Sequence, residues 1–143
     1  MDGNTATAWV EGASGQEVGE VVMIPRLDLD KPIQFWNGYG KSEKLYQYNS
    51  RVKKARMHIF RGKFQGAGNC GAAFKEIIKV ASLDVNLLDR NGFQPLGVPT
   101  FQKDKFDYQS QQWDYSYWLA IEIVSVYPGS KWADTCISEV RNN

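Results

Sequence analysis

Residues 117–126 (YWLAIEIVSV) carry the longest β-type pattern in the chain and constrain its fold more than any other segment. One set of alternate positions, from Tyr117 to Ile123, holds only aromatic and aliphatic side chains, whereas the other set includes Glu122. A period of two is typical of a strand with one buried face. The run stops at Pro128-Gly129, which is a turn signal. The pattern therefore predicts a long β-strand over 117–126.

Shorter segments of the same kind are separated by turn signals such as Asn37-Gly38 and Asn91-Gly92. The predicted strands besides 117–126 are 18–24, 33–36, 55–60, 81–87 and 135–140. Only residues 72–79 could form a helix of any length, and the IIKV sequence at 77–80 suits a strand equally well. Many short strands with one helix at most predict an all-β fold, an antiparallel β-sandwich. Without a linker or repeat, residues 1–143 are expected to form a single domain.

The charge balance excludes some classes of partner. The chain has 17 Lys+Arg against 16 Asp+Glu, a net charge of +1, so it lacks the basic footprint of a nucleic-acid binder. No apolar run is long enough to span a bilayer, so no membrane insertion is predicted. His58 is the only histidine in the chain. A single histidine makes a Ser-His-Asp hydrolase difficult to build and excludes a His-rich zinc site. We predict that the chain is not an enzyme.

The compartment is not settled by the residues themselves. The N-terminus lacks the basic and apolar regions of a signal peptide, so the chain is either cytosolic or a domain cut from a longer secreted protein. Cys70 and Cys136 can be a disulfide or two free thiols, and both alternatives stay open.

Aromatic residues make up 13% of the chain, and they fall into two groups. Trp9, Trp36 and Trp118 lie in or beside apolar strands and are predicted to belong to the core. In contrast, Tyr39, Trp113 and Tyr115 lie in polar stretches, where an exposed ring can stack on the C–H face of a sugar while neighbouring amides and hydroxyls bind its hydroxyl groups.

Two short motifs offer sites for other ligands. Residues 66–71 (GAGNCG) match the G-x-G-x-x-G pattern, which binds a dinucleotide only when it joins a strand tightly to a helix. Nucleotide binding through this loop is kept as a minor alternative. Asp2, Asn4 and Thr7 place several oxygen atoms in one short loop, which suits a hard cation such as Ca²⁺.

Three segments together resemble a known family. The opening DGNTATAWVEG (2–12) resembles the D-G-D-x-x-T-A-W-x-E-G motif of discoidin-like, galactose-binding domains. Residues 37–42 (NGYGKS) and 49–54 (NSRVKK), with the ending VYPGSKWADTCISEV (126–140), resemble one branch of these domains. That branch contains the glycan-binding translocation domain of secreted bacterial NAD glycohydrolase toxins.

The resemblance implies a jelly-roll β-sandwich that binds a glycan or glycoconjugate on a surface, without catalysis, beside a separate enzymatic domain. It also implies a secreted or cell-surface protein. Relatives often hold a structural Ca²⁺ between the opening loop and the last strand, and the matching positions here are Asp2, Asn4, Thr7 and Glu139. Relatives usually have a strand before the opening motif, so either that strand is missing from this chain or the domain is complete without it.

We therefore predict a glycan-binding module. The expected stacking residues are Tyr39, Trp113, Tyr115 and Trp132, and Arg51 is the expected donor to a sugar hydroxyl or carboxylate. The principal alternative is a protein–protein adapter on the same fold, because a polar surface rich in aromatic side chains serves proteins as well as sugars.

Overall fold

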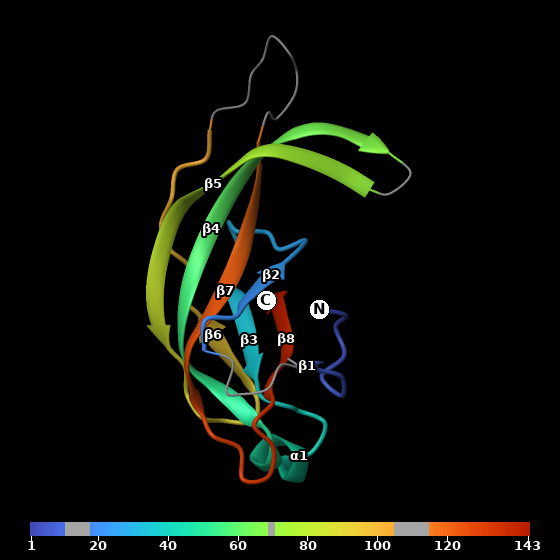
Figure 1. The fold of residues 1–143 in the computed structure, drawn as a ribbon, viewed down its shortest axis with the longest axis vertical. Helices are drawn as coiled ribbons and strands as arrows, with labels where there is room; N and C mark the ends of the chain where they lie inside the picture. The colour runs from blue at the N-terminus through green and yellow to red at the C-terminus, as the bar shows by residue number, and fades with distance from the viewer. Residues whose placement is uncertain (11–17, 69–70, 105–114) are drawn as a thin grey trace.

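A computed structural model of the chain describes residues 1–10, 18–68, 71–104 and 115–143. Nearly all of its regular structure is β (Figure 1). The strands are β1 (Trp9–Val10), β2 (Val21–Ile24), β3 (Ile33–Asn37), β4 (Ser50–Gly68), β5 (Gly71–Asn86), β6 (Phe93–Leu96), β7 (Tyr115–Tyr127) and β8 (Thr135–Asn142). One helix, α1 (Glu43–Tyr48), lies at the end of the molecule opposite the β4–β5 turn.

The strands form one open, mixed sheet with the order β2-β7-β4-β8-β3-β6, in which β5 pairs with β4 and β1 pairs with β8. All strand pairs are antiparallel except the short pairing of β4 with β8, where Ser50 lies opposite Thr135 and Arg51 opposite Cys136. After this contact β4 pairs with β5 in place of β8. The sheet is thereby divided into two halves, with β5, β4, β7 and β2 in one and β1, β8, β3 and β6 in the other.

The hydrophobic core draws side chains from both halves of the sheet. In β7 the predicted face is confirmed, because Leu119, Ile121 and Ile123 are fully buried. Ile121 lies opposite Met57 of β4, which is equally buried. Burial of each such side chain contributes about 1.5–3 kcal/mol to stability. The prediction of an all-β sandwich is confirmed, and a strand lies in each of the six predicted segments, although β2 begins only at Val21 and β5 ends at Asn86.

The structure decides one open alternative and adds one element. Residues 72–79 belong to strand β5 rather than to a helix, because they pair with β4 as far as the arm tip, where Ala72 lies opposite Ala67. The helix α1 was not predicted. It begins after Ser42, whose Oγ accepts a hydrogen bond from the Leu45 amide at 3.2 Å, as an N-cap residue does.

The tryptophans are less buried than predicted. Trp9 packs against the core, but it remains half-buried. Trp36 and Trp118 are also half-buried and alternate with the core residues of β3 and β7, so they lie on the opposite faces of their strands. Trp36 Nε1 donates to Asn91 Oδ1 at 3.0 Å. The prediction of a core position is therefore wrong for Trp36 and Trp118.

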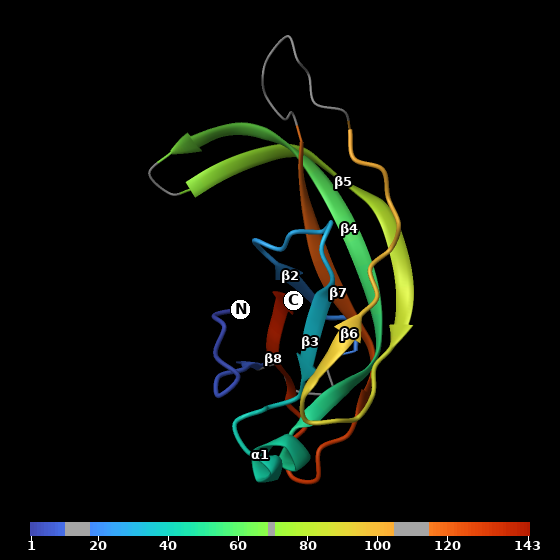
Figure 2. The ribbon, with the colours of Figure 1, turned by 180° about the vertical axis from the view of Figure 1, so that it is seen from behind.

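The long hairpin of β4 and β5 extends beyond the rest of the sheet as a curved arm (Figures 1 and 2). Strand β7 accompanies β4 as far as the pair Lys63–Tyr115, and beyond it β4 pairs only with β5 among the described residues. Across the part of the chain described here, no helix is long and apolar enough to cross a membrane.

Candidate functional site

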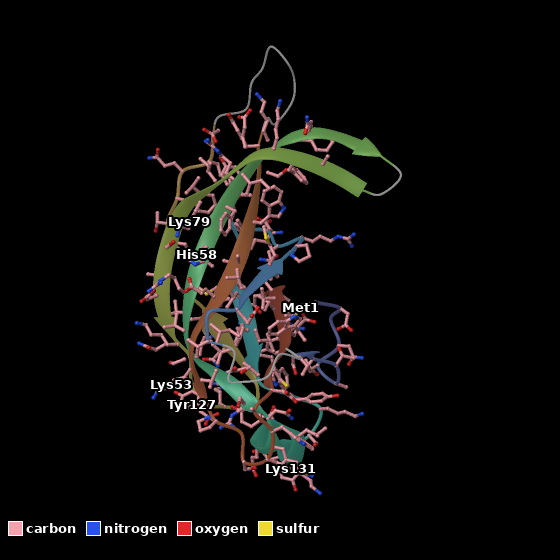
Figure 3. The ribbon with its side chains drawn as sticks, viewed as in Figure 1. Met1, Lys53, His58, Lys79, Tyr127 and Lys131 are labelled. Atoms are coloured by element: carbon pink, nitrogen blue, oxygen red, sulfur yellow. The ribbon has the colours of Figure 1, made fainter. Side chains whose placement is uncertain are left out.

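The predicted ligand-binding residues do not converge on one place. Tyr115 begins β7, whereas Trp132 lies in the loop that follows the other end of this strand. Tyr39 lies half-buried in the loop between β3 and α1. Trp113 falls outside the described residues. Figure 3 labels Lys131 and Tyr127, which lie toward the α1 end of the molecule.

Tyr115 lines a cleft of about 310 Å³ at the arm end of the sheet. The lining combines two phenol rings, two carboxylates and one ammonium group with two leucines: Tyr115, Tyr117, Asp28, Asp30, Lys103, Leu27 and Leu29. Such a mixture of rings with a few charged groups is typical of a small-molecule binding site. The cleft is the strongest candidate site that contains a predicted residue.

The acidic side of this cleft is held by local hydrogen bonds. The Asp28 carboxylate accepts a hydrogen bond from the Asp30 amide at 3.0 Å and pairs with Lys31 at 3.3 Å. These contacts lower the pKa of Asp28, the Asp30 amide contributing most. Asn142 of β8 bonds both the amide and the carbonyl of Asp28. Asp28 is therefore an ionised acceptor on an anchored turn.

The aromatic side of the cleft rests on a second cluster. The Arg61 guanidinium lies 4.3 Å from the centre of the Tyr115 ring and donates to Asp104 at 2.8 Å. Tyr117 Oη donates to the same Asp104 carboxylate at 2.6 Å and accepts from the Asp104 amide at 2.8 Å. The Tyr117 hydroxyl and Arg61 lower the pKa of Asp104, and burial raises the pKa of Tyr117. The two rings are thus held by their neighbours before any ligand arrives.

Trp132 forms a separate aromatic surface with Tyr48 at the other end of the molecule. The two rings meet edge to face at 5.2 Å, and Lys131 lies 4.6 Å from the Trp132 ring centre and 5.3 Å from that of Tyr48. Trp132 is 38% exposed. Its amide donates to the Tyr48 carbonyl at 2.8 Å, and a Cβ at Gly129 would lie 2.4 Å from that oxygen. The loop therefore presents Trp132 rigidly, and glycine is required at position 129.

Arg51 has protein partners for each of its nitrogen atoms. Nε and Nη2 donate to Asp89 at 3.0 and 2.7 Å, and Nη1 donates to the carbonyls of Asn49 and Pro128. Its guanidinium also lies 5.1 Å from the Tyr46 ring centre. With a side chain only 10% exposed, Arg51 connects segments of the fold and is not directed into either aromatic site.

Three of the four predicted calcium ligands, Asp2, Asn4 and Thr7, are hydrogen-bonded to one another, and the fourth, Glu139, contacts the same loop through the Gly3 backbone. Glu139 Oε2 accepts a hydrogen bond from the Gly3 amide at 2.6 Å, which places the last strand against the opening loop. Within that loop, Thr7 Oγ1 donates to the Asp2 carboxylate at 2.9 Å and to the Asn4 carbonyl at 2.8 Å. Hydrogen bonds from the Asn4 amide and from Thr7 lower the pKa of Asp2.

This cluster fits a hard cation in one respect. Glu139 is only 2% exposed, and both of its oxygen atoms accept bonds from backbone amides, Oε1 from Val140 and Oε2 from Gly3. Burial of a carboxylate is costly, and a calcium ion would compensate its charge. Among the described residues, no group of three or more His, Cys, Asp or Glu side chains is positioned to hold a metal, so carbonyl, amide and hydroxyl oxygens would have to complete the set.

The glycine motif at 66–71 does not have the structure that a dinucleotide site needs. It spans the turn between β4 and β5 at the tip of the arm, and Gly68 lies opposite Gly71. Strand β5 stands where the helix N-terminus would have to be. The structure therefore gives no support to the nucleotide alternative. Cys136 is buried, and Cys70 lies outside the described residues.

Sequence reasoning missed most of the cleft residues. Three segments that are separate in the sequence form the cleft: the 25–32 turn with Asp28 and Asp30, the segment after β6 with Lys103, and β7 with Tyr117. Sequence spacing alone does not show that these segments meet. One signal was present: Asp28 and Asp30 belong to a short acidic turn, LDLDK at 27–31, directly before a predicted strand.

Comparison with known proteins identifies the family. The family model described as the NAD glycohydrolase translocation F5/8 type C domain matches residues 1–143. No curated protein and no solved structure matches the chain.

Proposed function

The chain belongs to the family of NAD glycohydrolase translocation F5/8 type C domains, and we propose that it is a non-catalytic module that binds glycans on a surface. The observation that carries this proposal is the cleft in which Tyr115 and Tyr117 stand opposite two aspartates and a lysine. A sugar offers hydroxyl groups that both donate and accept, together with C–H faces that stack on rings. The cleft supplies a partner for each of these features.

Each group has a proposed part in binding. One face of the Tyr115 ring lies against Arg61, and we assign the sugar ring to its other face. Asp28 and Asp30 accept hydrogen bonds from sugar hydroxyls, and Lys103, which pairs with Asp30, donates one. These contacts would set the specificity of the cleft.

The Trp132 surface is proposed as a second contact. Its exposed ring and the adjacent Lys131 favour an anionic glycan, because the ring stacks on the sugar and the ammonium group pairs with a carboxylate or sulfate. The two sites lie at opposite ends of β7, so they would engage separate glycans of a dense surface rather than one short oligosaccharide. Two weak contacts to the same surface increase avidity.

Calcium is proposed as a structural ion between the opening loop and β8. It would be held by Asp2, Asn4, Thr7 and Glu139, and it would supply positive charge to the buried Glu139 carboxylate. Its effect would be on stability, since none of these residues lines the Tyr115 cleft.

The domain would act beside an enzyme. The family name places it in NAD glycohydrolases as a translocation domain, so we propose a secreted protein whose NAD-cleaving activity resides in a separate domain. A glycan array probed with the full chain tests the glycan proposal. Binding that depends on Tyr115 supports it, and an array without a bound glycan contradicts it.

A protein–protein adapter remains the second candidate function. It is favoured by one specific feature: within the described part of the chain, the second edge of β5 pairs with no strand, and a glycan would not recognise such an edge through backbone hydrogen bonds.

A further inference from the structure

We propose that the free edge of β5 in the arm, with the apolar cleft beside it, is a docking site for an extended segment of a partner protein whose apolar side chains alternate with carboxylates. This site is separate from the Tyr115 cleft, so it adds a protein partner to the glycan contact.

The first observation is the open edge. In the residues that the structure describes, β5 pairs with β4 alone, from Asn86 opposite Lys54 to Gly71 opposite Gly68. Its second edge therefore presents a row of backbone N–H and C=O groups without a strand partner. An edge of this kind accepts an extended peptide as an additional strand.

The second observation is the apolar character of the arm beside this edge. Ile77, Ile78 and Val80 are 53%, 46% and 36% exposed. Next to them is an apolar cleft of about 320 Å³ between the arm and β2. Its lining consists of Met23, Pro25, Phe74, Ile77 and Trp118.

The cleft is built by packing on the outer face of the sheet. The Phe74 and Trp118 rings meet edge to face at 4.6 Å. A Cβ at Gly62 would lie 2.8 Å from the Trp118 ring, so the indole lies flat on the β4 backbone. The resulting hollow can receive an aliphatic side chain from a strand that runs along β5. Pockets for alternate side chains are what give strand addition its specificity.

The third observation is the charge of the arm, where three lysines are accompanied by one carboxylate, that of Glu76. Lys63 lies directly opposite Lys75 in the strand register, and Lys79 is the next lysine along β5. Like charges in directly opposed positions destabilise a strand pair. The ion pairs of the described residues include none of these three lysines. A partner segment with carboxylates would relieve this repulsion.

A protein strand fits these observations better than a membrane does. The described residues nearest the tip of the hairpin are small, GAG at 66–68 and GAA at 71–73. The bulky apolar side chains lie farther from the tip, in residues 74–80 of β5. A lipid bilayer would also leave the backbone edge unpaired in hydrocarbon, at a cost of several kcal/mol per group. A second copy of the chain fits less well, because it would bring the same lysines to the shared edge.

The test uses the full chain and a fluorescein-labelled peptide of about ten residues that alternates valine with glutamate. Fluorescence anisotropy is expected to show saturable binding, and the double variant Lys75→Glu/Lys79→Glu is expected to weaken it by about tenfold or more. The same peptide with N-methyl groups on alternate amides keeps its charge but cannot pair with a strand, so it is expected to lose binding to the wild-type chain.

The matched control is Lys41→Glu, an exposed lysine in the loop before α1, which should leave peptide affinity unchanged. Thermal unfolding checks that the double variant folds, which is expected because Lys75 and Lys79 are exposed and do not belong to the core. The proposal would be overturned if the N-methylated peptide bound as tightly as the unmodified peptide. It would also be overturned if the chain bound phosphatidylserine vesicles but not the peptide. A third contradicting result would be self-association of the chain that the double variant Lys75→Glu/Lys79→Glu abolishes.

Discussion

The guanidinium of Arg51 and the carboxylate of Asp89 form a two-point ion pair, with Nε 3.0 Å from Oδ1 and Nη2 2.7 Å from Oδ2. The Tyr46 hydroxyl donates to the same Oδ1 at 2.7 Å. This arrangement joins the start of β4, the helix α1 and the segment after β5. Arg51 belongs to the segment 49–54 that resembles one branch of the family. Its observed partners are all groups of the protein itself, so its role in this structure is to stabilise the fold.

Arg51→Lys is expected to lower the free energy of unfolding by about 2 kcal/mol, because lysine cannot reproduce the two-point contact in a mostly buried position. Urea denaturation measures the loss. Arg90→Lys is the matched control, since Arg90 is exposed and its change should be within about 0.5 kcal/mol. Wild-type stability combined with lost glycan affinity in Arg51→Lys would instead assign Arg51 to the ligand.

The same pair predicts how stability changes with pH. Hydrogen bonds from Arg51 and then from Tyr46 lower the pKa of Asp89 in the folded protein. Its contribution to stability is therefore fully present above the unfolded pKa of about 3.9 and is lost as the pH falls through the folded value. The free energy of unfolding between about pH 6 and pH 2 should fall less steeply in Asp89→Asn than in the wild type. Equal slopes would contradict the assignment.

Calcium is expected to raise the melting temperature, because an ion bound only by the folded state stabilises it by about 2.7 kcal/mol at a hundredfold excess over Kd. Glu139→Gln should abolish this response, since the amide removes the buried negative charge. Glu43→Gln, on the exposed face of α1, is the control and should keep it. Identical melting curves in calcium and in chelator would contradict the proposal that the domain binds a structural calcium ion.

Trp132→Ala is expected to reduce binding to a glycan-coated surface by about threefold to tenfold, because one of two contacts is lost. Trp132→Phe should retain part of the affinity through its smaller ring. Surface plasmon resonance on immobilised glycans distinguishes the variants. If Lys131→Ala affects neutral and anionic glycans equally, the proposed role of its charge is wrong.

Much of the fold could be predicted from the sequence, because period-two patterning reports directly on strands with one buried face. The β7 face from Leu119 to Ile123 is the clearest case. The arm was harder. Residues 72–79 have no strict alternation, and their strand conformation comes from pairing with β4, which is a nonlocal contact. Trp118 illustrates the same limit, since a large ring in an apolar strand can also cover an outer face.

The candidate site could be predicted only in part. Tyr115 and Trp132 were identified from polar surroundings and from family motifs, and both have exposed or half-exposed rings in clusters. Asp28, Asp30 and Lys103 carry no motif, because sequence spacing does not encode which turns meet at one end of a sandwich. Asp2, Asn4 and Thr7 were grouped by their spacing, and Glu139 was added through the family resemblance; the Gly3–Glu139 hydrogen bond connects the opening loop to β8.

The most direct test of the central claim is calorimetric titration of the full chain and of Tyr115→Ala with the glycan that binds most strongly on an array. We expect the variant to lose about tenfold or more in affinity through the missing stacking contact, while its melting temperature stays near that of the wild type. Phe64→Ala, which removes an exposed ring of the arm, should bind as the wild type does. Undiminished affinity in Tyr115→Ala would contradict the assignment of the Tyr115 cleft as the glycan site.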